Sequence, residues 1–259
     1  MISRNPIQAI ILLFLSLILT NNLSAYNEPG AFNLKVPTGI KSGNAEFKIQ
    51  HRFAGKINED PFNTLFGMYM GANINLSLRY IVWSKLELEG SYSNYSKESS
   101  LCASYSYSFP LMKALLGGQF FSYEEYNLDK KSFERKSSIM GLLSVQTEPI
   151  IKRIILTIDI GYDGYEKKPG AGLGASIIIL ERPGTLKKLI LIGEYFPTKL
   201  NSDVNNCYCF GLRAETYGHH FDFIISNGSE IGLRRLMLGT VKEEGLYFGF
   251  NIKRLIERG

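Results

Sequence analysis

The sequence has few of the residues on which most catalytic and metal sites depend. Its 259 residues include only three histidines, three cysteines and one tryptophan. So few histidines leave little scope for imidazole-based acid–base or zinc chemistry. The net charge of +5 is small and forms no basic stripe, so we expect no nucleic-acid partner. The composition argues against an enzyme, a metalloprotein and a nucleic-acid-binding protein.

Long apolar runs are also missing after the first 25 residues. Ile7 to Leu19 is almost entirely apolar, follows Arg4 and is followed by small residues ending at Ala25. A basic start, an apolar stretch and a small-residue cleavage site are the parts of a signal peptide. No later window approaches the roughly 20 apolar residues that a membrane helix needs. We therefore predict an exported chain without membrane-spanning helices.

What the sequence does contain is a regular alternation of apolar and polar residues. Between Ala72 and Tyr80 every even-numbered residue is apolar and every odd-numbered residue is polar. The same period of two recurs at Leu86–Ser93 and Leu156–Asp163, and in further segments along the chain. This period is typical of a β-strand whose two faces meet different surroundings. Together with weaker segments, the pattern predicts about twelve strands.

The links between the predicted strands alternate in length. Short links such as Trp83–Ser84 alternate with long polar links such as Ala54–Thr64 and Glu124–Lys136. Outer-membrane barrels have short periplasmic turns and longer external loops. A twelve-stranded lumen is too wide for side chains alone to fill with an apolar core, whereas a barrel with an apolar lipid face and a polar lumen needs none. The predicted fold is all-β: a single antiparallel transmembrane β-barrel of about twelve strands. The alternative is a soluble exported protein with two smaller β-sandwiches.

Five stretches of this pattern are distinctive: Glu46–Phe53, Gly71–Ile74, Gly218–Phe223, Ser226–Asn227 and Phe248–Ile252. They resemble a bacterial outer-membrane β-barrel family known as domain of unknown function 5777. The chain departs from the family pattern at Ile224, where a histidine is expected. The resemblance implies a location and a fold and assigns no activity.

This architecture implies surroundings and a division of the chain. We expect a bacterial outer-membrane location, with outer-membrane lipid and lipopolysaccharide around the barrel and the barrel-insertion machinery as a partner during assembly. The expected parts are a signal peptide (1–25), a periplasmic N-terminal segment (26–42) and the barrel (43–259).

Polar side chains on the predicted inner face are the candidates for function. Across the short link between the second and third strands, Arg79 is predicted to face Glu87 or Glu89, a pairing that would fix the register. The candidate lumen-facing residues are Arg79, Glu87, Glu89, Asp159, Arg213, Glu215 and Asp222. The wider inner set, which adds Glu46, Lys48, Arg52, Glu148, Asp163, Glu194 and Lys253, has nine acids against five bases. These residues form either a selectivity region for a solute or a paired network that plugs the barrel.

The last long link, Asn227–Glu244, is more apolar than a solvated loop should be. Its apolar positions 233, 236 and 237 fit one helical turn whose other face carries Arg234 and Arg235. Folded into the barrel mouth, this turn would form a constriction. The alternative is that the segment only lengthens the two flanking strands.

The remaining motifs predict no catalytic or metal site. Cys207 and Cys209 are two residues apart on a strand, at or beyond the limit of disulfide geometry, so with Cys102 they predict thiols or at most one strained bridge. Gly170–Gly174 lacks nucleotide-binding spacing and is interpreted as a loop entering a strand. We therefore expect no catalytic residue, no cofactor and no metal. The expected function is a narrow passive channel for a small solute. The alternatives are a closed structural or partner-binding barrel and an exported soluble β-barrel that binds a ligand.

Overall fold

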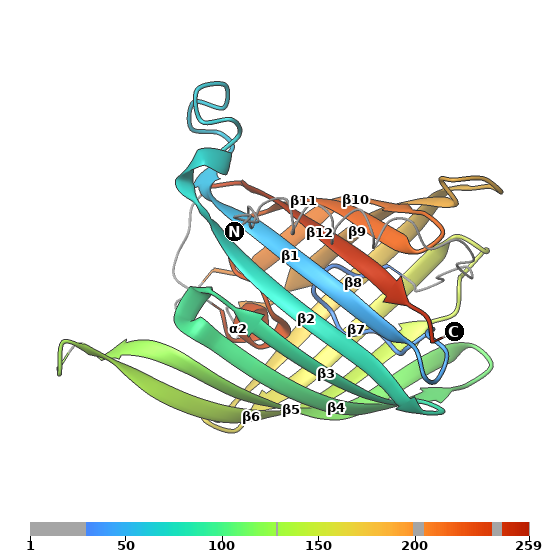
Figure 1. The fold of residues 1–259 in the computed structure, drawn as a ribbon, viewed down its shortest axis with the longest axis horizontal. Coiled ribbons are helices and arrows are strands. Elements are labelled where there is room, and N and C mark those ends of the chain that lie inside the picture. The colour runs from blue at the N-terminus through green and yellow to red at the C-terminus, as the bar shows by residue number, and fades with distance from the viewer. Residues whose placement is uncertain (1–29, 128, 199–204, 240–244, 259) are drawn as a thin grey trace, which may run out of the picture.

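The computed structural model describes residues 30–127, 129–198, 205–239 and 245–258. The predicted signal peptide, 1–25, lies outside the described residues. Antiparallel strands β1 to β12 each pair with their neighbours in sequence, and β12 pairs with β1 to close a barrel (Figure 1). The predicted fold class, a single antiparallel barrel of about twelve strands, is confirmed. Among the described helices, none is long and apolar enough to cross a membrane.

The strands are β1 (Ala45–Lys56), β2 (Ala72–Trp83), β3 (Leu86–Ser93), β4 (Glu98–Ser108), β5 (Met112–Asn127), β6 (Ser132–Thr147), β7 (Ile154–Asp163), β8 (Lys168–Glu181), β9 (Lys188–Phe196), β10 (Cys207–Glu215), β11 (His219–Ser226) and β12 (Tyr247–Ile256). The helical elements are the short turns η1 (Met68–Met70) and η2 (Tyr95–Lys97) and the helix α2 (Leu233–Leu238).

The alternation of the sequence sorts side chains between the outside and the inside of the barrel. On β7, Ile158 and Ile160 are 46% and 52% exposed, whereas Asp159 between them is fully buried. A soluble barrel would show the reverse, with its apolar side chains inside. The apolar outer face and the polar inner face are the arrangement of a barrel surrounded by lipid.

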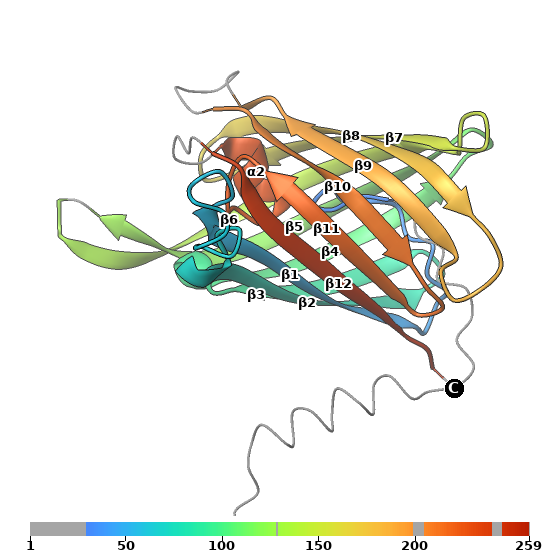
Figure 2. The ribbon, with the colours of Figure 1, turned by 90° about the horizontal axis from the view of Figure 1, so that it is seen from above.

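The two ends of the barrel carry different links. At one end, here the short-link end, β2 and β3 are joined by residues 84–85 and β10 and β11 by residues 216–218. The other, the long-loop end, carries the links 57–71, 197–206 and 227–246. The helix α2 lies at the long-loop end, on the same side as the projecting β5–β6 hairpin (Figure 2).

That hairpin differs from the prediction of a long polar link between residues 124 and 136. β5 and β6 continue to pair as far as Asn127 and Ser132 and project beyond the rest of the barrel (Figure 1). Tyr126 and Phe133 pack edge to face with ring centroids 5.2 Å apart, which stabilises the extension.

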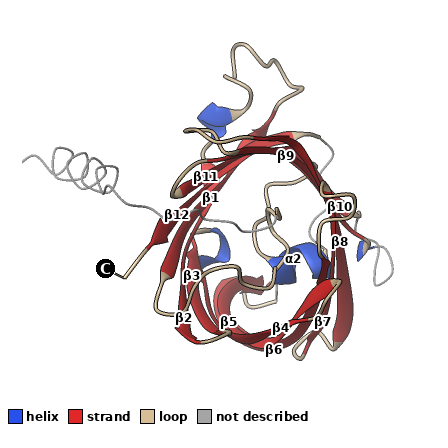
Figure 3. Cartoon of the chain, turned by 90° about the vertical axis from the view of Figure 1, so that its right-hand side faces the viewer, coloured by secondary structure: helices blue, strands red, loops and turns tan. Residues whose placement is uncertain are grey.

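The lumen is filled by the chain itself. Figure 3, turned so that the right-hand side of Figure 1 faces the viewer, shows α2 and loop segments inside the ring of strands. An apolar cluster within the barrel joins Leu34 and Val36 to Leu236 and Met237. The periplasmic segment at 26–42 stays a prediction; in its described part, residues 30–38 lie against the inner wall of the barrel, whereas Gly39, Lys41 and Ser42 are exposed. The physical reason for this contact is the polar inner wall, which offers the segment hydrogen-bond partners.

Candidate functional site

The lumenal segment, residues 30–43, is held first by one carboxylate of the wall. Glu194 of β9 accepts hydrogen bonds from the backbone N–H groups of Phe32 (2.6 Å), Asn33 (3.0 Å) and Leu34 (3.2 Å). The Asn33 side-chain amide donates to the same carboxylate at 2.9 Å. Successive backbone N–H groups that converge in this way form a site for an anion. Here the anion is a buried side chain, so the carboxylate and the backbone satisfy each other.

Lys35 attaches the segment to two other walls of the barrel. Its backbone N–H donates to Asp159 of β7 at 2.7 Å, and its carbonyl accepts from Ser144 of β6 at 2.8 Å. Its ammonium pairs with Glu89 of β3. Burial alone would lower the pKa of Lys35, but the adjacent Glu89 carboxylate raises it above its usual value, so the ammonium stays charged.

The carbonyl groups of the segment are satisfied as well. The Arg213 guanidinium donates to the Ala31 carbonyl at 2.6 Å, and the Ser176 hydroxyl donates to the Gly30 carbonyl at 2.5 Å. Buried backbone groups are costly when they lack partners. The inner wall therefore supplies both the acceptors and the donors that an irregular backbone needs inside a barrel.

The predicted pairing across the β2–β3 link has the register Arg79 opposite Glu89. The Arg79 guanidinium, however, lies 3.2 Å from Glu46 and 3.7 Å from Glu87. Glu89 instead pairs with Lys35 of the lumenal segment and lies 3.9 Å from Lys48.

The candidates on β10 and β11 form a second group. Arg213 meets Asp222 through two hydrogen bonds, at 2.6 and 3.0 Å, the paired geometry that suits guanidinium and carboxylate. Glu215 lies 3.7 Å from His220 across the same strand pair. The structure thus places all seven candidate lumen-facing residues on the inner face: six form two groups, Asp159 lies apart from both on β7, and the lumenal segment contacts all three places. Their role in solute passage remains a prediction.

Glu148 does not join these groups. It follows the end of β6, is partly exposed and pairs with Lys113 at 3.0 Å at the short-link end. The sequence places this set in or at the mouth of the lumen, and Glu148 lies at the mouth, where it lines a cavity with Gly39 and Glu215.

The segment between β11 and β12 contains the predicted helical turn. β11 ends at Ser226 and β12 begins at Tyr247, so the described residues between them do not lengthen either strand. In α2, Arg234 contacts Asp163 at 2.5 Å and the Tyr123 hydroxyl at 2.9 Å, while Arg235 contacts Glu98 at 3.0 Å. Its action as a constriction remains a prediction.

The glycine-rich stretch lies inside β8 rather than in a loop before it. A Cβ on Gly170 would lie 2.5 Å from the Cβ of Met237 in α2, and one on Gly172 or Gly174 would lie 2.5–2.6 Å from Leu34. Alternate glycines therefore leave a smooth track on the inner face. The helix and the lumenal segment both pack along it.

Sequence reasoning missed several residues of this network, chiefly Asn33, Lys35 and Glu98. Lys35 and its neighbours show no periodicity, so no strand or helix rule points to them. One signal was available, because the predicted inner face has more acids than bases and so calls for donors from outside the strands.

The chemistry of the site is that of hydrogen bonding and ion pairing. No group of three or more metal-ligating side chains gathers among the described residues. Cys102, Cys207 and Cys209 are thiols, in line with the first of the two predicted states.

A closed barrel of alternating strands, apolar outside and polar inside, defines a membrane β-barrel. A family model described as a membrane bound beta barrel domain, domain of unknown function 5777, matches residues 31–133 and 176–256. The chain belongs to this family, as the resemblance of its strand motifs implied. No curated protein matches the sequence. Among solved structures, a NanC porin in a rhombohedral crystal form is similar, with 7% identity and a TM-score of 0.46, covering 83% of this chain and all of that one.

Proposed function

We propose that the protein is an outer-membrane barrel that forms a narrow passive channel for a small solute, closed at rest by its lumenal segment. The outer membrane is the location that a signal peptide and a membrane β-barrel together imply. A wide barrel with a charged inner face is suited to act as a channel.

The observation that supports the proposal is that residues 32–35 bind three carboxylates of the inner face. Glu89, Asp159 and Glu194 come from three different strands and all bind this one short stretch. The contacts with these carboxylates are hydrogen bonds and an ion pair, which can be exchanged for contacts with water, whereas Phe32 and Leu34 of the same stretch also pack in apolar clusters. Displacing the segment would expose a polar passage through the barrel.

Conductance of the purified full chain in planar bilayers tests this proposal. The full chain should show little conductance with brief openings, and a variant without residues 30–42 should show stable conductance. Glu194→Gln weakens the hold on the three N–H groups and should lengthen the openings. Glu181→Gln is the matched control, because Glu181 is exposed at the short-link end. Equal conductance of the full chain and the deletion variant would contradict closure by the segment.

A closed barrel that binds a partner without conducting is the second candidate. The apolar cluster of Leu34, Val36, Leu236 and Met237 inside the lumen favours it, since a dry core resists displacement. This function predicts that the deletion variant, shown to be folded by its heat-modifiable mobility on a gel, still fails to conduct.

A further inference from the structure

Arg52 of β1 is a buried cation with an unusual set of partners. It is 1% exposed, and among the described residues no carboxylate lies within ion-pair distance of its guanidinium. Its Nη1 donates to the His51 carbonyl at 2.9 Å, to the Phe250 carbonyl at 3.4 Å and to Asn251 Oδ1 at 3.0 Å. Its Nη2 donates to Asn33 Oδ1 at 3.2 Å. A buried charge is costly when no opposite charge meets it.

Two asparagines separate Arg52 from the nearest acids. Asn33 accepts from Arg52 and donates to Glu194 at 2.9 Å, and Asn251 accepts from Arg52 and donates to Asp222 at 2.9 Å. Each of these carboxylates also has strong donors of its own. One side-chain amide therefore separates the guanidinium from each of the two carboxylates.

One edge of the Arg52 guanidinium remains available. Its Nε–H and one of its two Nη2–H groups have no acceptor in the part of the chain that the structure describes. Nε and Nη2 lie on the same edge of the guanidinium, the edge with which arginine binds anions.

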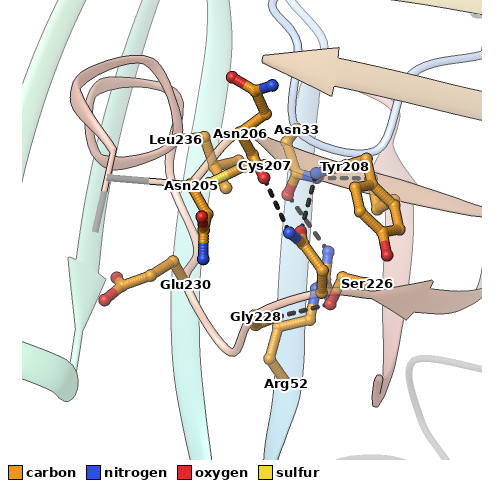
Figure 4. A pocket seen from close by; sticks show the side chains of 12 residues that line it. Asn33, Arg52, Asn205, Asn206, Cys207, Tyr208, Ser226, Gly228, Glu230 and Leu236 are labelled. Atoms are coloured by element: carbon orange, nitrogen blue, oxygen red, sulfur yellow. Dashed lines mark hydrogen bonds between the residues drawn. The ribbon is translucent and has the colours of Figure 1, made fainter. Parts of the chain in front are cut away.

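Arg52 lines a small cavity at the long-loop end, drawn in Figure 4. The cavity measures about 20 Å³, against the roughly 10–15 Å³ that one water molecule needs. Its wall is tied together by hydrogen bonds: Asn227 donates to the Asn206 carbonyl at 2.8 Å, and Ser226 donates to the Gly228 carbonyl at 2.6 Å. Glu230 also lines the cavity, but its carboxylate points away from Arg52 (Figure 4).

We propose that this cavity binds a small monovalent anion, either a halide ion or the carboxylate of a small organic acid, on the free edge of Arg52. The cavity is preformed, holds a cation at its base and has room for one such group. The bound anion would complete the charge balance of Arg52 and strengthen its hold on Asn33, at the turn of the lumenal segment. The site is beyond the proposed function, since binding at rest requires no conductance.

Crystals of the full chain soaked in bromide test the site directly. An anomalous bromide peak within hydrogen-bond distance of Arg52 is expected in the wild type and should be absent from Arg52→Gln. Absence of both this peak and a formate response in the wild type would overturn the proposal, leaving a cavity that holds water only.

Heat unfolding, followed on gels, tests whether a bound anion stabilises the protein. Formate serves here as the small carboxylate. Sodium formate should raise the midpoint of wild-type unfolding until the effect saturates, while sodium sulfate at equal ionic strength should not, because sulfate is too large for the cavity. The response should be lost in Arg52→Gln and retained in the control Arg182→Gln, which alters an exposed arginine of the short-link end.

Arg52→Lys covers the case in which Arg52→Gln fails to fold. Lysine keeps the buried charge but lacks the fork, so formate should act only at higher concentration. An unchanged response in either variant would overturn the proposal. A bromide peak without any effect of sodium bromide or sodium formate on the unfolding midpoint would mean an adventitious ion only and would overturn it too. None of these measurements uses conductance, so the failure of this proposal and that of the channel are distinguishable.

Discussion

Neighbouring residues on one strand of this barrel meet opposite surroundings. Ile158 faces outward beside Leu156 and Ile160, while Thr157 and Asp159 are buried on the inner side. The effect of a substitution on the free energy of unfolding therefore depends on the face that it alters. A substitution on the outer face tests the contact with lipid alone.

Ile158→Arg should destabilise the barrel by about 2–4 kcal/mol, the cost of an arginine near the membrane midplane. Ile158→Ala is the control, since it loses apolar contact but brings no charge into lipid. Urea unfolding in lipid vesicles measures both variants. Equal stability of the two would mean that this face does not contact the hydrocarbon.

The polar residues show how far sequence reasoning reaches at this scale. The alternation correctly predicted that Arg79 lies opposite Glu87 or Glu89, because register follows from the length of a tight link. It could not predict that Glu89 pairs with Lys35, since Lys35 belongs to a stretch without periodicity. Local pattern determines the face of a residue, whereas partners supplied from distant segments depend on the closed barrel.

Among the elements, α2 depends on the glycines of β8 for its position. A Cβ at Gly170 would meet the Cβ of Met237 at 2.5 Å, which is an atom near the helix backbone and cannot move alone. A Cβ on Gly141, which lies on the outer face, would have no atom within 4 Å.

Gly170→Ala should therefore displace α2 and destabilise the protein by about 1–3 kcal/mol, the usual cost of overpacking. Gly141→Ala, the matched control, should be nearly neutral. Chemical denaturation of the two variants gives the comparison. A neutral Gly170→Ala would show that the helix does not pack closely on β8.

The two arginines of α2 should contribute unequally. Arg234 is buried and has both Asp163 and Tyr123 as partners, whereas Arg235 is more exposed and has Glu98. Arg234→Gln should loosen the helix by about 1–3 kcal/mol, because Asp163 loses a charged donor. Arg235→Gln, the matched control, should have a smaller effect. Hydrogen exchange over residues 233–238 measures the difference, and equal exchange in the two variants would contradict this ranking.

The elements also differ in how well their sequences predict them. About twelve strands were predictable, some from clear local alternation and the rest from weaker segments, and the helical turn of α2 was one of two open alternatives. The contacts of the lumenal segment with the inner wall were not predictable, because its own residues carry no pattern that indicates them. The excess of acids on the predicted inner face was the only sign that further donors must enter the lumen.

In the whole molecule, two separate pieces of chain contact the inner wall of the barrel. The lumenal segment binds the middle of the wall, and α2 binds Asp163 and Glu98 at the long-loop end. They meet in one apolar cluster, where Leu34 and Val36 pack with Leu236 and Met237. If the barrel is a channel, these pieces are obstacles in series along a single path.

Obstacles in series predict a specific order of conductance. Removing Glu230–Gly239 alone should change conductance little, because the lumenal segment still fills the path. Removing 30–42 should raise it more, and removing both should raise it most, since the narrowest obstacle limits the flow. Planar-bilayer recordings on variants shown to be folded by heat-modifiability measure this order. If the loss of α2 alone gave the conductance of the double deletion, the helix rather than the lumenal segment would be the limiting barrier.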